Sequence, residues 1–128
     1  MQDDFTTQAA AVFVCHSDLD FANMCRQLQV QYHLPDFRFD EHSRWEYARS
    51  LGQRMGLNVT KNERLGEMAQ WMAGIPMTVN YQIILYLKRI DDAEGDATQD
   101  SGITTDDVHR FLNQLFVTEV IWVNRLPL

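Results

Sequence analysis

The sequence predicts a mainly α-helical protein, a compact bundle of about five helices joined by tight turns that contain glycine. Apolar residues recur at helical spacing in several segments, residues that can cap helices precede those segments, and a short glycine-containing phrase links them. Each of these observations is typical of helices packed side by side. Residues 1–128 are expected to form a single domain, with an acidic connecting loop at 91–103.

The first helix is predicted to run from about Asp18 to Tyr32. Ser17 can cap it, and Asp20 follows three residues later in a weaker variant of the capping box. Pro35 ends it, because the residue before a proline avoids the helical conformation. The buried face of this helix would hold Phe21, Cys25, Leu28 and Tyr32.

Two further helices are predicted over the middle of the chain. Asp40 can cap one that reaches about Met55, and Thr60 with Glu63 forms a full capping box for the next. The apolar stripe of the first would hold Trp45, Ala48, Leu51 and Met55, and that of the second Leu65, Met68 and Met72.

A short phrase recurs between these helices. Residues 56–60 read Gly-Leu-Asn-Val-Thr, residues 74–78 read Gly-Ile-Pro-Met-Thr, and residues 102–104 are a compressed version, Gly-Ile-Thr. Glycine readily takes the left-handed conformation after a helix, and threonine caps the helix that follows. This pattern predicts a fourth helix at 79–90 and a fifth after Thr104, which forms a capping box with Asp107. Their buried positions would be Val79, Ile83, Leu87 and Ile90, and then Val108, Phe111, Leu112 and Leu115.

Strands are the alternative for three segments of the chain. The apolar residues of the fourth predicted helix also alternate as in a half-buried strand, and two other segments are rich in β-branched and aromatic residues. The alternative fold is α+β, with a small sheet from segments 11–15, 79–88 and 117–124. We expect the helical fold, because the turn phrases are more specific than either period in a short apolar run.

The net charge of −7 comes from one stretch of the chain. From Asp91 to Asp107 there are seven acidic residues and no basic one, whereas the rest of the chain holds eleven of each. This stretch can be a solvated loop before a helix, an ion site, or a surface for a basic partner. The acidic balance speaks against nucleic acid as a partner, because such proteins neutralise phosphates with lysine and arginine.

No catalytic motif is found, so we predict no enzyme activity and no cofactor. No export signal and no apolar run long enough to span a bilayer is present, and Cys15 and Cys25 do not form a CxxC pair. A cytoplasmic protein with reduced thiols and no membrane contact is therefore expected. The three tryptophans and six methionines are expected mostly in the core, with some at an interface, where both residue types are enriched.

One part of the acidic stretch has the spacing of a calcium loop. Residues 96–107, DATQDSGITTDD, place oxygen-bearing side chains at positions 1, 3, 5 and 12 and an aliphatic residue at position 8. The segment resembles the EF-hand family, in which such oxygens surround the ion. Ser101 stands where the family has glycine. The resemblance implies calcium binding by Asp96, Thr98, Asp100 and Asp107.

A second resemblance covers residues 69–87, AQWMAGIPMTVNYQIILYL. A glycine and an aliphatic residue precede Thr-Val at the start of an apolar run, and in this the segment resembles a helix-turn-helix motif. The resemblance implies DNA binding through the second of the two helices, which enters the major groove in that family.

The function predicted from these observations is that of a small intracellular macromolecule-binding protein, such as an inhibitor, an immunity-type protein or an assembly factor. Its acidic segment would face another protein with a basic surface, because such a segment speeds association with a cationic partner. A degenerate, single EF-hand-like calcium-binding protein is the first alternative, and a helix-turn-helix DNA-binding protein is the second. The residues expected at the protein contact are Asp91, Asp92, Glu94, Asp96 and Asp100.

Overall fold

The computed structural model describes residues 8–42, 45–52, 55–64, 66–72, 74–87, 90–91, 97–98, 104–115 and 120–123. Strands and helices alternate irregularly along these residues. Their bounds are β1 (Gln8–Cys15), α1 (Phe21–Tyr32), β2 (Arg38–His42), β3 (Trp45–Leu51), β4 (Met55–Asn62), α2 (Glu67–Trp71), β5 (Tyr81–Leu87), β6 (Ile90–Asp91), β7 (Ala97–Thr98), α3 (Thr105–Leu115) and β8 (Ile121–Val123).

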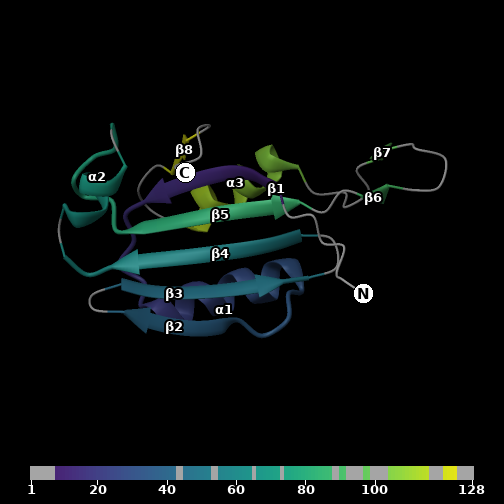
Figure 1. Ribbon diagram of the computed structural model, residues 1–128, viewed down its shortest axis with the longest axis horizontal. Coiled ribbons are helices and arrows are strands. Elements are labelled where there is room, and N and C mark those ends of the chain that lie inside the picture. The colour runs from purple at the N-terminus through teal and green to yellow at the C-terminus, as the bar shows by residue number, and fades with distance from the viewer. Residues whose placement is uncertain are drawn as a thin grey trace.

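Six of the strands form one sheet in the order β2-β3-β4-β5-β1-β8, in which every neighbouring pair is antiparallel (Figure 1). Strands β2 to β5 follow one another in both the chain and the sheet. β1 instead lies between β5 and β8, which come much later in the chain. The short strands β6 and β7 pair with each other beyond the end of β5 (Figure 1).

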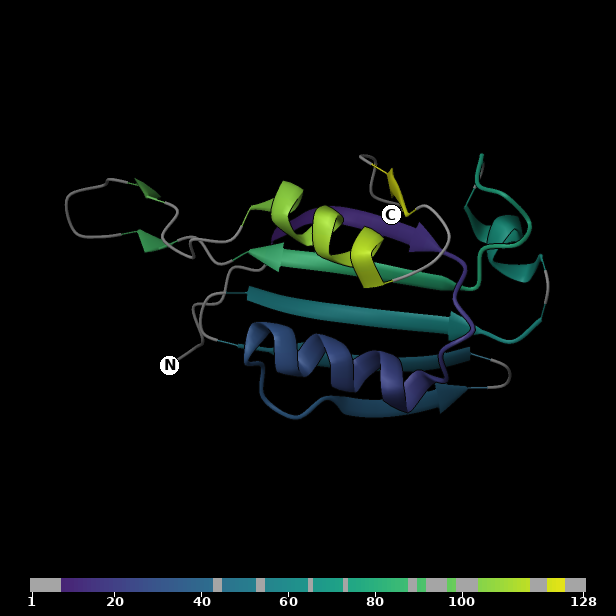
Figure 2. The same cartoon turned by 180° about the vertical axis from the view of Figure 1, so that it is seen from behind.

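Helices α1 and α3 lie on the same face of the sheet, which we call the helical face (Figure 2). Alternate residues of each strand point to this face, as the two-residue period of a strand requires. The main core fills the space between the two layers. Its fully buried members include Phe13 and Cys15 of β1, Leu28 of α1 and Leu112 of α3.

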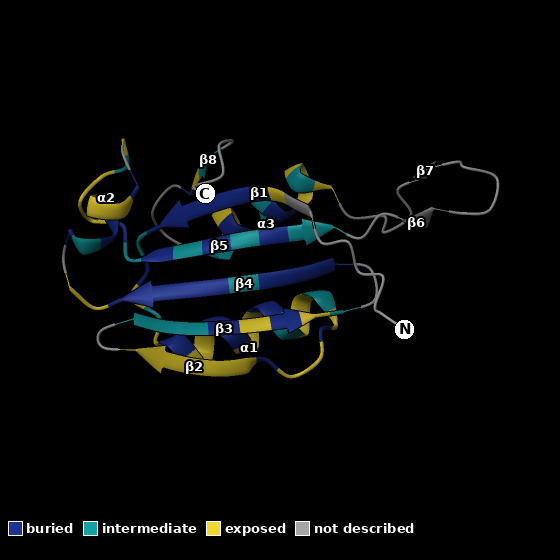
Figure 3. Ribbon diagram, in the orientation of Figure 1, coloured by how far each residue is buried: buried dark blue, intermediate teal, exposed yellow. Residues whose placement is uncertain are grey.

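No helix of the described residues crosses the middle of the opposite face, which we call the open face (Figure 1). The short helix α2 lies at one end of the sheet, where β4 leads into β5 (Figure 1). Below it, Met68, Met72 and Val79 pack on Val12 and Val14 of β1 in a second, smaller core. Away from this core, β2 and part of β3 are exposed (Figure 3).

The prediction of a mainly helical bundle is wrong, because the molecule is built on the six-stranded sheet. The described residues hold three helices, and one of them, α2, has only five residues. The α+β alternative named the segments that form β1, β5 and β8, which are neighbours in the sheet. It missed β2, β3 and β4, of which β2 and β3 overlap the second predicted helix and β4 takes the predicted cap of the third. Of that third helix, only the five residues of α2 are helical, and Met68 is buried as predicted.

The second predicted helix failed because an apolar spacing of three residues occurs by coincidence in two strands. In β3 successive side chains point to opposite faces. Ala48 is therefore buried beneath the helices, while Trp45 and Leu51 belong to the open face. Met55, the last member of the predicted stripe, starts the next strand, β4.

The glycine phrase at 56–60 is the interior of β4 and not a turn. Gly56 is opposite Leu51 on one side and Tyr86 on the other. A Cβ atom at Gly56 would come within 2.5 Å of Leu51 Cδ2 and 3.1 Å of the Ser50 carbonyl oxygen, so the Leu51 side chain would have to move to admit it. Thr60 caps no helix, because it is buried in the same strand.

The fourth predicted helix, at 79–90, is replaced by strand β5, in which Tyr81, Ile83 and Leu85 point into the core. The helix-turn-helix resemblance therefore has no second helix that could enter a DNA groove. Its glycine does form a turn: Gly74 has a φ of 87°, and the Val79 N–H then donates to the Pro76 carbonyl oxygen at 3.2 Å.

The first and last predicted helices are confirmed as α1 and α3. Asp20, and not Ser17, caps α1, since its Oδ1 accepts from the Asn23 N–H at 2.8 Å. The helix ends at Tyr32, and His33 follows in the left-handed conformation with a φ of 53°.

Candidate binding site on the open face of the sheet

Aromatic and methionine side chains line a hollow of about 290 Å³ on the open face. The lining comes from four elements, because β3, β4 and β5 form the floor and α2 forms one wall. We call it the aromatic–methionine hollow, and it is lined by Trp45, Tyr47, Thr60, Met68, Trp71, Met72 and Gln82.

The register of the sheet brings the floor of the hollow together. Tyr47 of β3 is directly opposite Thr60 of β4, and Thr60 is opposite Gln82 of β5. Because directly opposite residues of an antiparallel pair point to the same face, these three side chains form one row across the open face. Trp45 lies two residues before Tyr47, on the same face of the same strand.

Helix α2 is anchored so that its last turn closes the hollow. Gly66, with a φ of 82°, turns the chain into the helix, and Met68 is buried in the smaller core. The Gln82 side-chain amide donates to Met72 Sδ at 3.1 Å, which ties the end of α2 to β5. Trp71 in the same turn keeps 70 % of its surface exposed. The wall of the hollow is therefore held in place while its largest side chain faces solvent.

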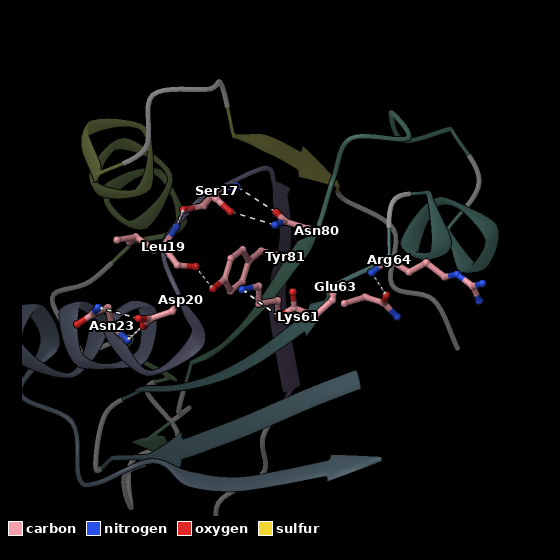
Figure 4. Close-up of polar contacts among 10 residues, drawn as sticks. Ser17, Leu19, Asp20, Asn23, Lys61, Glu63, Arg64, Asn80 and Tyr81 are labelled. Carbon is pink, nitrogen blue, oxygen red and sulfur yellow. Dashed lines mark hydrogen bonds and ion pairs between the residues drawn. The ribbon is translucent and has the colours of Figure 1, made fainter. Parts of the chain in front are cut away.

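A polar network fixes the strand ends next to α2 (Figure 4). The Asn80 side chain accepts from the Ser17 N–H and donates to the Ser17 carbonyl oxygen, both at 2.9 Å. The Tyr81 hydroxyl donates to the Leu19 carbonyl oxygen at 2.7 Å. Burial raises the pKa of Tyr81, so its hydroxyl keeps the proton that it donates. These contacts hold β5, and with it Gln82, in a fixed position.

Lys61 completes this end of the sheet on the helical face. Its ammonium lies 5.4 Å from the centre of the Tyr81 ring and 3.3 Å from Glu63 Oε2 (Figure 4). Cation–π attraction and an ion pair together compensate for a lysine that is only 9 % exposed. This charge is used within the fold and does not belong to the hollow.

The thiols of Cys15 and Cys25 lie in the main core, away from the hollow. Burial raises the pKa of each to about 12, with Glu46 adding to the effect at Cys25. The reactive form of a cysteine is the thiolate. Neither side chain is therefore set up as a nucleophile.

The acidic residues predicted to contact a partner cannot be placed as a surface. Asp92, Glu94, Asp96 and Asp100 lie outside the described residues, and Asp91 is described only as part of the backbone of β6. Of the four residues predicted to bind calcium, only Thr98, in the backbone of β7, and Asp107, in α3, are described.

Asp107 has a structural role in α3. Its Oδ2 accepts from the Thr104 N–H at 3.2 Å, and its own N–H donates to Thr104 Oγ1 at 3.1 Å, which confirms the predicted capping box. Its Oδ1 accepts from Arg110 Nη1 at 3.2 Å. The bonds from Thr104 lower the pKa of this carboxyl, and Arg110 adds to the effect. Elsewhere in the described chain, no group of three or more His, Cys, Asp or Glu side chains could hold a metal ion.

Sequence reasoning did not locate the hollow. Trp45 and Trp71 were recognised as residues of the core or an interface, and the sequence could not say which. Thr60 is predicted from the sequence as a helix cap, and no sequence pattern links it to Tyr47 and Gln82, because three strands bring these residues together from distant parts of the chain. The alternation of Trp45, Tyr47 and Arg49 is the one local signal of a strand with an aromatic face, and it lies in a segment predicted to be a helix.

No protein-family model, curated protein or solved structure matches this chain. Among the described residues, no helix is both long and apolar enough to cross a membrane.

Proposed function

We propose that the chain is a binding protein for another protein, as an inhibitor, an immunity-type protein or an assembly factor, and that it docks through the aromatic–methionine hollow. The observation that carries the proposal is the exposure of Trp71 over a hollow lined by Trp45, Tyr47 and two methionines. Aromatic residues and methionine are enriched in the buried centres of protein interfaces, and tryptophan and tyrosine dominate binding energy there.

The open position of the hollow on the surface of the sheet favours a side chain of a partner over an enclosed cofactor. Sites for small molecules commonly occupy about 300–1,000 Å³ and enclose most of the ligand. At about 290 Å³ on the surface of a sheet, the hollow accommodates one bulky apolar side chain whose neighbours remain outside. Thr60 and Gln82 on its floor offer hydrogen-bonding groups next to this apolar lining.

The acidic segment has a separate part in the proposal. Asp91, Asp92, Glu94, Asp96 and Asp100 would attract a partner whose overall surface is basic, and so speed the first encounter. The distribution of charge along the sequence supports this role, since acidic and basic residues are equal in number outside the segment from Asp91 to Asp107. The hollow would then provide the short-range contact that holds the complex together.

The experiment compares two exposed apolar side chains on opposite faces of the molecule. Trp71 (70 % exposed) borders the hollow, and Val30 (69 % exposed) lies on α1, in the helical layer. For a partner isolated with the wild-type chain, we expect Trp71→Ala to weaken binding at least tenfold, the loss typical of a central tryptophan. Val30→Ala should leave it unchanged, and both variants should keep the wild-type Tm because neither side chain is buried.

The dissociation constant is measured by titration calorimetry with each variant. Equal affinity of the wild-type chain and Trp71→Ala, at an unchanged Tm, would contradict docking at the hollow. A loss with Val30→Ala alone would place the contact on the helical layer instead.

A further inference from the structure

A second hollow, of about 350 Å³, adjoins the aromatic–methionine hollow on the open face. Tyr47 lines both, so the two are separated by one side chain. The polar lining of the second hollow is Arg38 and Asp40 of β2, Arg49 of β3 and Asn58 of β4.

Arg38 and Arg49 are directly opposite each other in the register of β2 and β3, and both are exposed. We call them the arginine pair. Like charges directly opposite on neighbouring strands destabilise a sheet. Among the described residues, no ion pair compensates either guanidinium. Asp40 lies nearby on β2, and its Oδ1 accepts from the Glu41 N–H at 2.8 Å. The local excess is thus one positive charge on a chain whose net charge is −7.

A carboxylate between two guanidinium groups would relieve this repulsion and form charge-assisted hydrogen bonds with both. Arginine suits this role because its planar group can donate two parallel bonds to one carboxylate. Asn58, opposite Arg49 on β4, adds an amide at the border of the same hollow. The arrangement therefore suits an acidic side chain.

The spacing of the two hollows sets where that acidic side chain lies in the partner. Tyr47 and Arg49 are two residues apart on β3, which is about 6.6 to 6.8 Å along a strand. An extended segment lying along β3 has the same rise, and its alternate side chains point to the same side. A bulky side chain of such a segment that packs against Tyr47 therefore places the side chain two residues away beside Arg49.

We propose that the site recognises an extended segment of a partner protein that carries a bulky apolar side chain and, two residues away, an aspartate or glutamate. This inference rests on the proposed function, since the apolar anchor occupies the aromatic–methionine hollow. The arginine pair adds selectivity for the acidic residue. Such a local acidic residue is compatible with a partner whose overall surface is basic.

Selection from a library of random heptapeptides on the immobilised chain tests the apolar contact of the proposed function and the acidic preference of this inference separately. We expect enrichment of one bulky apolar position with an acidic residue two positions away. On Arg38→Thr/Arg49→Thr the acidic preference should disappear while the apolar one persists. On Trp71→Ala the apolar preference should weaken. Arg26→Gln, in the exposed part of α1, is the matched control and should select the same peptides as the wild-type chain.

The affinity of a selected peptide gives the quantitative test. Replacing its acidic residue by the corresponding amide should weaken binding about tenfold at low salt, and less at high salt, where charges are screened. The double arginine variant should bind both peptides equally. Its Tm without peptide should be slightly above that of the wild-type chain, because the repulsion is gone.

The outcomes distinguish failure of this inference from failure of the proposed function. Apolar enrichment without an acidic preference overturns this inference and leaves the proposed function standing, and a lower Tm in the double arginine variant overturns it too. No enrichment on the wild-type chain contradicts both. Competition by a single-stranded oligonucleotide at the same site would also contradict both, because it would make the open face a platform for stacked bases.

Discussion

At the scale of single residues, the capping box of α3 shows a carboxylate used for structure inside an acidic stretch. Thr104 and Asp107 satisfy each other's backbone N–H groups at the start of the helix, where no backbone partner is available. Asp106, its neighbour in sequence, is exposed and contributes its charge to the same first turn. Two adjacent aspartates thus differ in role, and only the spacing from Thr104 distinguishes them.

This difference predicts how stability depends on pH. The lowered pKa of Asp107 means that its ionised form is favoured by folding. Its contribution is therefore present above the pKa of the unfolded chain, about 3.9 for an aspartate, and is lost as the pH falls through the lower pKa of the folded state. Asp107→Ala should be less stable than the wild-type chain at pH 7, and the gap should shrink in acid.

Urea denaturation of both chains between neutral and acidic pH measures this gap. Asp106→Ala is the control, and its smaller deficit should follow only the loss of a favourable charge at the helix start. A deficit of Asp107→Ala that stays constant down to the most acidic condition would show that its ionisation is not linked to folding.

At the scale of elements, local signals decided which parts could be predicted. Helices α1 and α3 were predictable because, in each segment, residues that can cap a helix come directly before an apolar stripe of helical spacing. Strands β3 and β4 were not, because Trp45, Ala48, Leu51 and Met55 follow a helical period by coincidence. The choice between helix and strand there depends on partners: Ala48 and Met55 are buried only because α1 and neighbouring strands cover them. The same reason hid the candidate site, since its residues converge only through sheet register.

A substitution at Gly56 tests whether residues 56–60 form the interior of a strand, as in the structure, or a turn, as the sequence predicts. In the sheet, a Cβ at this position meets Leu51 Cδ2 at 2.5 Å and the Ser50 carbonyl oxygen at 3.1 Å. Gly56→Ala should therefore destabilise the chain by about 1 kcal/mol, the low end of the cost of overpacking, because the exposed Leu51 side chain can move aside whereas the Ser50 carbonyl oxygen cannot. Trimming the neighbour should relieve part of the clash, so the loss caused by Gly56→Ala should be smaller in a Leu51→Ala background.

Denaturant titration of the four chains in this double-mutant cycle gives the coupling between the two positions. If the losses in free energy of unfolding are additive, contact between positions 51 and 56 does not explain the effect of Gly56→Ala. Gly74→Ala is a useful contrast, because Gly74 has a φ of 87° and no atom within 4 Å of the added Cβ. Gly74→Ala should lose stability only because alanine disfavours this backbone conformation, and the loss should be the same with Leu51 or Ala at position 51.

At the scale of the whole molecule, the excess negative charge and the open face come from different parts of the sequence. The open face combines apolar side chains with the arginine pair, while the acidic residues are concentrated between Asp91 and Asp107. A net charge of −7 would act at long range, and the open face only on contact. The two features therefore predict different kinetic effects.

Neutralising the five acidic residues proposed to face the partner should slow association about tenfold at low salt, with little change in dissociation. The substitutions are Asp to Asn and Glu to Gln at 91, 92, 94, 96 and 100. The control neutralises five acidic residues elsewhere, which leaves the same net charge: Asp3, Asp4, Asp18, Glu41 and Glu119. Surface plasmon resonance over a range of salt compares the rates. Equal slowing by both sets would assign the effect to net charge and not to the segment.

The position of β1 between β5 and β8 also governs how the chain folds during synthesis. β2, β3 and β4 pair with neighbours in sequence, so their contacts can form as soon as they leave the ribosome. β1 is made before them, yet both of its partners come after them. Its central residues Val12, Phe13 and Val14 are fully buried in the finished protein, and until β5 arrives they have no sheet to join. Such long-range pairing slows folding and exposes apolar strand to aggregation. β1 is thus made before both of its neighbours in the sheet and is the last strand to be flanked on both sides.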